Sequence, residues 1–289
     1  MPVAERRAVI HRGMDQRVAA VVRPAPETTR TDHQVHVDGG IITVRSYRPD
    51  RPGRLACHVY VHGGGWWLGD LDHRDAACGE TATGVGCVVV SVGHRLAPEH
   101  RFPVPVHDCY AALRWVVDHA DRLGVDASRL SIGGDSSGAN LAAAATLMAR
   151  DEGGPPLRAQ VLEIPALDLT MSQPSVNEDA QDVMLTRDDL ASNIERYCDP
   201  QDRRHRLASP LLADDLTGLP PALIMTAEHD ILRDDGEAYG LRLTQAGGSA
   251  EVRRWAGHVH GSHEMTAVLA SAREWQSHVA TFLRDRLNS

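Results

Sequence analysis

Hydrophobic and polar positions along the chain follow two rhythms. Short apolar runs predict strands at residues 35–37, 41–47, 57–61, 87–92, 130–133, 159–164, 222–226 and 251–255. Longer segments with helical spacing predict helices at residues 73–83, 105–123, 137–151, 235–246 and 262–287. Strands and helices alternate from about residue 55, which is typical of a parallel sheet with crossover helices. We therefore expect an α/β fold with a mostly parallel, eight-stranded sheet.

Some parts of the chain depart from this alternation. The first two strands flank Gly39-Gly40 and predict a hairpin. Residues 1–30 precede it, and residues 168–219 form a polar stretch between two strands. An insertion of that length is usually functional or disordered, and its Leu, Met and Tyr content favours an ordered, partly helical lid. We expect both segments to form a small helical cap on a catalytic body of residues 31–289.

Composition narrows the class of protein. The 289 residues are 42% hydrophobic and 24% charged, as in a globular protein, and the net charge of -9 argues against nucleic acid or an anionic membrane as partner. The five cysteines are widely spaced and odd in number, so we expect neither a disulfide framework nor a zinc ribbon. The longest apolar stretch, residues 141–149, is too short to span a membrane, and early charges argue against a secretory signal. A soluble, cytoplasmic chain is expected.

The sharpest chemical signal is Gly134-Asp135-Ser136-Ser137-Gly138, a G-x-S-x-G pattern between a predicted strand and an alanine-rich helix. In such a turn the serine is strained, and glycines two residues before and after it relieve crowding. Ser136 has both glycines, whereas Ser137 does not. Ser136 is therefore the candidate nucleophile, and Ser137 offers its backbone amide at the start of a helix. A chance match in a glycine-rich turn is the alternative, which the strand-turn-helix context disfavours.

A second signal is His62-Gly63-Gly64-Gly65-Trp66-Trp67, directly after a predicted strand. Gly63, Gly64 and Gly65 expose backbone amides, which can stabilise the oxyanion of a tetrahedral intermediate. A phosphate-binding loop is the weaker alternative, because the chain contains no lysine and therefore no G-x-x-x-x-G-K-[ST] pattern.

A nucleophile of this kind needs a base and an orienting acid, in the order Ser, Asp or Glu, His. Asp230 follows the predicted strand 222–226, which places its carboxylate at the same sheet edge as Ser136. Its rivals Glu228, Asp234 and Asp235 are more simply explained as charges of a loop and a helix start. The histidine has three candidates within one short segment, at positions 258, 260 and 263. That spacing allows a metal cluster, but without an adjacent carboxylate or cysteine we expect two of the three to be ordinary surface histidines.

These motifs together resemble the hormone-sensitive-lipase-like branch of the α/β-hydrolase carboxylesterases. The resemblance covers roughly residues 55–285 and rests on the glycine loop, on Arg95-Leu96-Ala97-Pro98-Glu99 with Phe102-Pro103, on the G-x-S-x-G turn, on Ser209-Pro210-Leu211, on Asp230 before Leu232-Arg233-Asp234, and on His260-Gly261. It implies an α/β-hydrolase fold and the triad Ser136, Asp230 and His260, because only His260 fits the family's G-x-x-H-G pattern. It also implies an oxyanion hole of the Gly64, Gly65 and Ser137 amides.

Two departures from the family pattern concern the pocket. The chain has Gly93-His94 where the family commonly has Asp-Tyr, and Ser262 where it commonly has Phe. Neither removes a triad residue, so we expect both to reshape the pocket and affect substrate preference rather than reaction type. Trp66, Trp67 and Leu211 are candidates for the pocket wall or for simple packing. We interpret the segment 95–99 as a structural turn.

The expected function is a serine carboxylesterase for short to medium acyl esters of small molecules. An amidase or deacetylase would use the same groups, and a non-catalytic ligand-binding protein is disfavoured because His260 is present. The proposed chemistry needs no cofactor and no metal. The sequence is compatible with a homodimer.

Overall fold

The computed structural model describes residues 2–178 and 184–288. Its centre is one eight-stranded sheet with the strand order β1-β2-β4-β3-β5-β6-β7-β8. β1 pairs antiparallel with β2, and β2 pairs antiparallel with β4, while all later neighbours are parallel. The strands are β1 (Thr29–Val37), β2 (Gly40–Arg48), β3 (Leu55–Val61), β4 (Val88–Gly93), β5 (Val125–Asp135), β6 (Leu157–Glu163), β7 (Ala222–His229) and β8 (Ala250–Val259). The predicted α/β fold, its eight strands and the hairpin at Gly39-Gly40 are confirmed.

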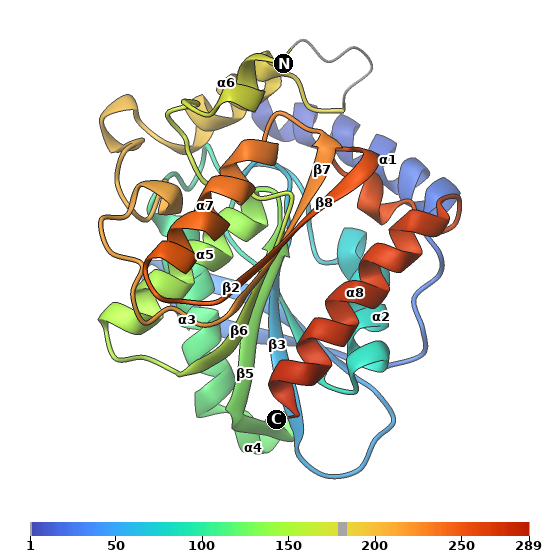
Figure 1. The fold of residues 1–289 in the computed structure, drawn as a ribbon. Helices are drawn as coiled ribbons and strands as arrows, with labels where there is room; N and C mark the ends of the chain where they lie inside the picture. Colours follow the sequence, from blue (N-terminus) through green and yellow to red (C-terminus); the bar gives the residue numbers. More distant parts are fainter. Residues whose placement is uncertain (1, 179–183, 289) are drawn as a thin grey trace.

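Helices cover both faces of the sheet (Figure 1). α2 and α8 pack together on one face, and α3, α5 and α7 cover the other (Figure 1). The α-helices are α1 (Val3–Val21), α2 (Asp75–Val85), α3 (Val104–Asp118), α4 (Ala120–Leu123), α5 (Ser137–Asp151), α6 (Arg187–Tyr197), α7 (Arg233–Gln245) and α8 (Ala270–Leu287); the short 3-10 turns are η1 (Asp72–Arg74), η2 (Pro174–Asn177), η3 (Pro200–Asp202), η4 (Pro210–Leu212) and η5 (Ser262–Glu264).

Two predicted helices are interrupted, which corrects the sequence analysis. The segment 105–123 divides at His119, whose backbone leaves the helical region while its ring bonds to the Trp115 carbonyl. The segment 262–287 begins with η5 and becomes helical again only at Ala270. Between them the chain turns, and the Ala267 amide donates to the carbonyl of Val21 at the end of α1. Tertiary contacts here outweigh the local preference for a continuous helix.

The core explains why α5 lies so close to the sheet. Ala142, Ala143, Ala144 and Ala145 are fully buried, and their small side chains let the helix backbone approach β3 and β5. Valine runs fill the central strands, because buried parallel strands are apolar on both faces. The body of the fold therefore fixes the point where β5 ends and α5 begins.

α1 and α6 lie together at the end of the molecule where β7 and β8 end (Figure 1). α6 begins with a capping box, in which Thr186 and Asp189 bond to each other's backbone amides. The prediction that the stretch 168–219 is partly helical is thus confirmed for residues 187–197. Within the described residues, no helix has the length and apolar character required to cross a membrane.

All five cysteines are buried as free thiols. Cys57 lies in β3, Cys87 just before β4, Cys78 in α2, Cys109 in α3 and Cys198 just after α6. Burial raises the pKa of each thiol, to about 12 for Cys78 and Cys87. The five cysteines form no disulfide with one another.

Candidate active site

Ser136 occupies the sharp turn between β5 and α5. Its φ is 53° and its ψ is -118°, a region that L-residues rarely adopt. The turn is close to the preceding strands, and a Cβ at either Gly134 or Gly138 would collide with the carbonyl oxygen of Val61. Its backbone is tied down by a 2.8 Å bond from the Ser136 amide to the carbonyl of Glu163. The sequence pattern of glycines on both sides of Ser136 therefore has a steric cause.

A continuous chain of hydrogen bonds joins Ser136, His260 and Asp230. Ser136 Oγ lies 3.1 Å from His260 Nε2, and His260 Nδ1 lies 2.8 Å from Asp230 Oδ2. Asp230 follows β7 and His260 follows β8, so two adjacent parallel strands deliver both side chains to the edge where β5 ends. Burial alone would lower the pKa of His260, but the charge of Asp230 and its hydrogen bond outweigh this and raise the pKa above 6.5.

The rival carboxylates serve other purposes. Glu228 accepts from the Gly257 amide, and Asp234 accepts from the Ser175 amide. Asp235 is buried and accepts from the amides of Leu167 and Asp168, and burial raises its pKa. Of the four candidates, the structure brings Asp230 to His260.

The three histidines of the segment 258–263 also separate. His258 is buried and bonds to the hydroxyls of Ser262 and Ser271, so it does not face Ser136. His263 is buried on the other side of the turn, near Asp135. The expectation of two surface histidines is therefore wrong, because His258 and His263 are both buried. Their side chains face different partners and do not form the joint cluster that the metal hypothesis requires. Ser262, one of the departures from the family pattern, has the local task of bonding to His258 and to the Val259 carbonyl.

The glycine loop lies against the turn that contains Ser136. The Gly63 amide donates to Asp135 Oδ1 at 2.9 Å, so Gly63 is already used and we remove it from the expected oxyanion donors. Gly64 and Gly65 line the same pocket as Ser136 and His260. Ser137, at the start of α5, accepts the Trp66 amide on its Oγ at 3.1 Å. Its side chain therefore holds the loop in place, a role that the sequence did not predict.

The pocket above Ser136 has a volume of about 360 Å³. α1 contributes Ile10 and Met14 to its wall, and α6 contributes Leu190 and Asn193. Trp66 also lines the pocket, where its ring stacks on Tyr197 with a centroid distance of 4.7 Å.

The other two wall candidates do not line this pocket. Trp67 is buried, with its indole bonded to Asn193 and the Arg196 guanidinium over its ring. Leu211 is buried beneath α7, where its carbonyl accepts from Arg242. Both therefore pack the structure, which is the alternative explanation that their sequence pattern allowed.

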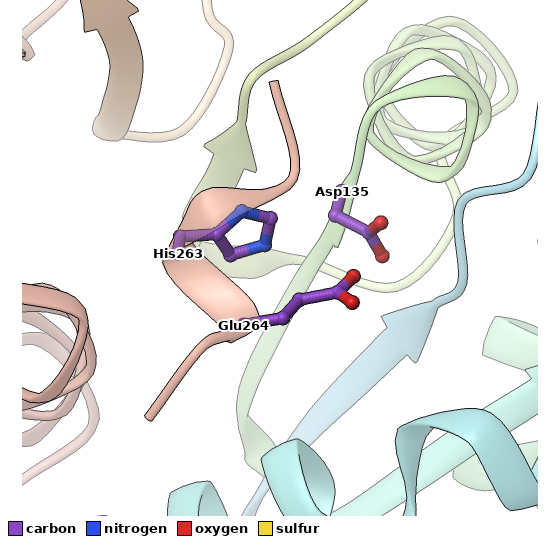
Figure 2. A group of neighbouring side chains, drawn as sticks. All are labelled: Asp135, His263 and Glu264. Atoms are coloured by element: carbon purple, nitrogen blue, oxygen red, sulfur yellow. The ribbon is translucent and has the colours of Figure 1, made fainter. Parts of the chain in front are cut away.

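A cluster of three polar side chains beside the site was not predicted from the sequence. Asp135 and the η5 residues His263 and Glu264 point toward one another (Figure 2), with potential ligand atoms within 4.8 Å of one another. Such a set can bind a metal ion in other proteins. Here the guanidinium of Arg74 already lies 2.8 Å from both Asp135 Oδ2 and Glu264 Oε1. A fixed cation of the chain itself therefore compensates these carboxylates.

Comparison with known proteins identifies the family of the chain. Residues 58–264 match a family described as having the alpha/beta hydrolase fold. The chain is 43% identical over 255 residues to carboxylesterase NlhH of Mycobacterium tuberculosis, an alignment that covers 86% of this chain and 80% of that protein. The chain belongs to the hormone-sensitive-lipase-like family of α/β-hydrolase carboxylesterases. As a member of this family it is a carboxylic ester hydrolase.

Solved structures of esterases agree with this family assignment. The fold matches EstE1, a thermostable carboxylesterase cloned from a metagenomic library, with a TM-score of 0.94 and 38% identity, over 99% of this chain and 98% of that one. It matches the esterase of Pyrobaculum calidifontis with a TM-score of 0.94 and 40% identity, over 99% of this chain and 93% of that one. The shared architecture thus extends over nearly the whole chain, including the region of α1.

Proposed function

We propose that this carboxylesterase hydrolyses esters of small molecules by nucleophilic catalysis, with Ser136 as nucleophile, His260 as base and Asp230 as orienting acid. The observation that carries the proposal is the hydrogen-bonded chain through these three side chains at the base of the pocket. The strained backbone of Ser136 supports it, because strain of this kind is concentrated at functional sites.

The first half of the reaction forms an acyl-enzyme. His260 Nε2 takes the proton of Ser136 Oγ as the oxygen attacks the ester carbonyl, and Asp230 stabilises the imidazolium. The carbonyl oxygen becomes an oxyanion, which the amides of Gly64, Gly65 and Ser137 stabilise at the positive end of the α5 dipole. When the carbon–oxygen bond to the alcohol breaks, His260 returns the proton to the leaving oxygen.

The second half removes the acyl group. A water molecule gives a proton to His260 Nε2 and attacks the acyl carbon, which again forms an oxyanion in the same position. Collapse of this intermediate breaks the bond to Ser136 Oγ, which recovers its proton from His260. The products are a carboxylic acid and an alcohol, and the chain returns to its starting state without a metal or an organic cofactor.

We also assign the cap to residues 1–30 and 168–219, with residues 31–289 as the catalytic body that contains the second of these segments. Support comes from the pocket wall, to which α1 and α6 both contribute apolar side chains. A pocket of about 360 Å³ fits a substrate of small-molecule size. We infer that short to medium acyl esters are the preferred substrates.

The decisive experiment is covalent trapping. A p-nitrophenyl alkylphosphonate should lose p-nitrophenol and leave its phosphonyl group on Ser136 Oγ, which tandem mass spectrometry of the 130–150 peptide locates. Ser136→Ala should lower kcat/KM for p-nitrophenyl butyrate by about 10⁴- to 10⁶-fold and abolish trapping. Ser137→Ala is the matched control, with a loss below about tenfold from one missing hydrogen bond. Phosphonylation of Ser137, or an active Ser136→Ala variant, would refute the assignment.

A parallel assay with the matching arylamide separates esterase from amidase activity. The groups around Ser136 serve either leaving group, so the ratio of the two kcat/KM values decides between them. We expect hydrolysis of the ester to exceed that of the amide by several orders of magnitude, since an anilide expels a much poorer leaving group.

A further inference from the structure

Arg74 connects two carboxylates that belong to different parts of the site. Its side chain is 8% exposed and lies at the end of η1, next to α2. The guanidinium donates two hydrogen bonds to Asp135, from Nε to Oδ1 at 3.2 Å and from Nη2 to Oδ2 at 2.8 Å. The same Nη2 lies 2.8 Å from Glu264 Oε1. Arg74, Asp135 and Glu264 all line the pocket beside Ser136 and His260.

Each partner of Arg74 is joined to a different catalytic segment. Asp135 directly precedes Ser136 and accepts the Gly63 amide at 2.9 Å, which ties the glycine loop to the serine turn. Tyr60 donates to the same Asp135 oxygen at 2.7 Å. Glu264 lies four residues after His260, in η5. One guanidinium thus links the serine turn, the glycine loop and the segment that follows His260.

We propose that Arg74 is a positioning residue of the ester hydrolysis, which acts through Asp135 and Glu264 to hold Ser136, the glycine loop and His260 in register. The proposal rests on the catalytic role proposed above for His260. A planar fork that bonds two carboxylates fixes their distance and direction more firmly than one flexible ammonium would. Misplacement of reacting groups by about 1 Å can cost on the order of 100-fold in rate.

The same cluster sets the charge beside His260. Burial opposes ionisation of Asp135, but Arg74 outweighs it and keeps the pKa of Asp135 below its ordinary value. Burial raises the pKa of Glu163 to about 8, so this neighbour is neutral at pH 7. Two carboxylates and one guanidinium then leave one net negative charge, which favours the imidazolium that forms during catalysis. The charges of Asp135 and Glu264 both raise the pKa of His260.

Other titratable groups face the cluster from the elements packed around it. They are Tyr60 of β3, Glu163 of β6, His73 of η1 and His263 of η5. Burial lowers the pKa of His263 and raises that of Tyr60, so both are neutral at pH 7. His73 bonds to Asp70 and Asp15, outside the cluster, and the bond to Asp70 raises its pKa. Glu264 is therefore the carboxylate whose removal most cleanly changes the charge near His260.

The test compares Glu264→Gln, Arg74→Gln and Arg74→Lys with Arg95→Gln. Arg95 is the matched control, because it forms a similar fork with a fully buried carboxylate, Asp108, and does not line the pocket. Steady-state kinetics with p-nitrophenyl butyrate gives kcat and KM across pH. Proton NMR follows the His260 ring directly, with its resonance identified by its absence in His260→Ala. Near-UV circular dichroism verifies that each variant is folded.

In Glu264→Gln, the His260 titration and the acid limb of kcat/KM should both move to lower pH. Its kcat should fall less than that of Arg74→Gln, because a glutamine amide oxygen can still accept from Arg74 while Arg74 keeps its bonds to Asp135. Arg74→Gln should lose about 10- to 100-fold in kcat with KM within about threefold, and Arg74→Lys should recover part of that loss. Arg95→Gln should unfold at lower temperature with neither change. An unmoved His260 titration in Glu264→Gln, or a full kcat in folded Arg74→Gln, overturns the proposal.

Two outcomes need separate treatment. If Arg74→Gln does not fold, folded Arg74→Lys decides: a lower kcat with KM within about threefold supports the positioning role, and a full kcat overturns it. If His260→Ala remains active, the proposed triad fails, whereas an inactive His260→Ala with an unmoved titration in Glu264→Gln overturns only the role of Arg74. The NMR readout keeps the two results apart because it does not depend on catalysis.

Discussion

Single residues at this site are held by several partners at once. Asp230 bonds to His260 with one oxygen and to the Leu232 amide with the other, so its carboxylate has little freedom to rotate. Ser136 is held by its backbone on both sides, since its amide donates to Glu163 and its carbonyl accepts from Asn140. Preorganisation of this kind is what makes a hydrogen-bonded triad catalytically effective.

His260 gives the first prediction at this scale. His260→Ala should lower kcat/KM about as much as the loss of Ser136, by about 10⁴-fold or more, because the triad acts as a unit. His258→Ala and His263→Ala should keep most of the activity, since neither bonds to Ser136. Esterase kinetics of the three variants checks this. Activity that survives in His260→Ala but not in His263→Ala would reverse the assignment.

The raised pKa of His260 also predicts how activity depends on pH. The base must be neutral to accept the serine proton, so kcat/KM should fall as the pH drops through a value above 6.5. A pH profile of kcat/KM measures that limb. A limb below 6.5 would indicate that the negative charges around His260 are weaker than their geometry indicates.

Glu163 gives a prediction about stability. The folded chain keeps a proton on this carboxyl up to a pKa of about 8, whereas the unfolded chain releases it near 4.5. The free energy of unfolding should therefore fall as the pH rises from about 4.5 to about 8, because over this range the folded chain still holds a proton that the unfolded chain has released. Glu163→Gln, which can still accept from Trp275, should decline less over that range than the natural chain. Urea unfolding at several pH values tests this, and parallel curves would contradict it.

Some of these residues were predictable from sequence and others were not. Ser136 stands between glycines that a steric turn requires, and Asp230 follows a recognisable strand, so local pattern was enough. Arg74 and Glu264 have no such local pattern. They are 190 residues apart in the sequence, and only the folded structure brings their side chains into contact. Asp135 was visible inside the G-x-S-x-G pattern, but its burial, and with it the need for a cationic partner, appears only in the folded structure.

At the scale of elements, the presence of each strand was predictable, but the helix ends and several strand ends were not. β1 begins at Thr29 and β5 at Val125, six and five residues before the predicted starts. Valine-rich runs identify buried parallel strands, whereas the breaks at His119 and after η5 depend on side-chain and tertiary contacts. The segment 95–99 behaves as the structural turn we expected. Arg95 bonds to Asp108, and Glu99 pairs with Arg7 of α1. This turn therefore also anchors the N-terminal helix.

The anchoring of α1 leads to a prediction at this scale. Arg7 donates to the carbonyls of Trp67 and Ala97 and pairs with Glu99, while Ile10 and Met14 of the same helix line the pocket. Arg7→Ala should loosen this wall and raise KM by roughly three- to tenfold, with a smaller change in kcat. Arg12→Ala, an exposed position on α1, is the control. Equal KM values in both variants would show that Arg7 does not order the helix.

At the scale of the whole molecule, the pocket wall is built from segments far apart in sequence. α1, α6 and the ends of β5, β7 and β8 meet only because the sheet order brings them to one edge. The family and its fold could be predicted from a few motifs, since each motif occupies a fixed place in that order. The pocket could not, because its walls come from the segments with the weakest patterns.

The size of this pocket predicts the response to acyl length. Each buried methylene adds about 0.8 kcal/mol, so kcat/KM for p-nitrophenyl esters should rise about fourfold per carbon at first. It should fall once the chain outgrows the cavity of about 360 Å³, because further carbons no longer stabilise the transition state. A series from acetate to palmitate, with emulsified triacylglycerol alongside, tests this. A continued rise, or a jump when an emulsion forms, would indicate a true lipase.

The buried thiols can report on local opening and unfolding of the chain. Cys198 lies directly after helix α6, whereas Cys57 lies in β3 in the middle of the sheet, and burial protects both in the folded chain. A maleimide or disulfide reagent can reach each sulfur only after its own surroundings open. Because the two positions report on different parts of the fold, the order in which they are alkylated would separate local opening around α6 from unfolding of the sheet. The natural chain thus already contains reporter cysteines at both positions, and no new cysteine has to be introduced.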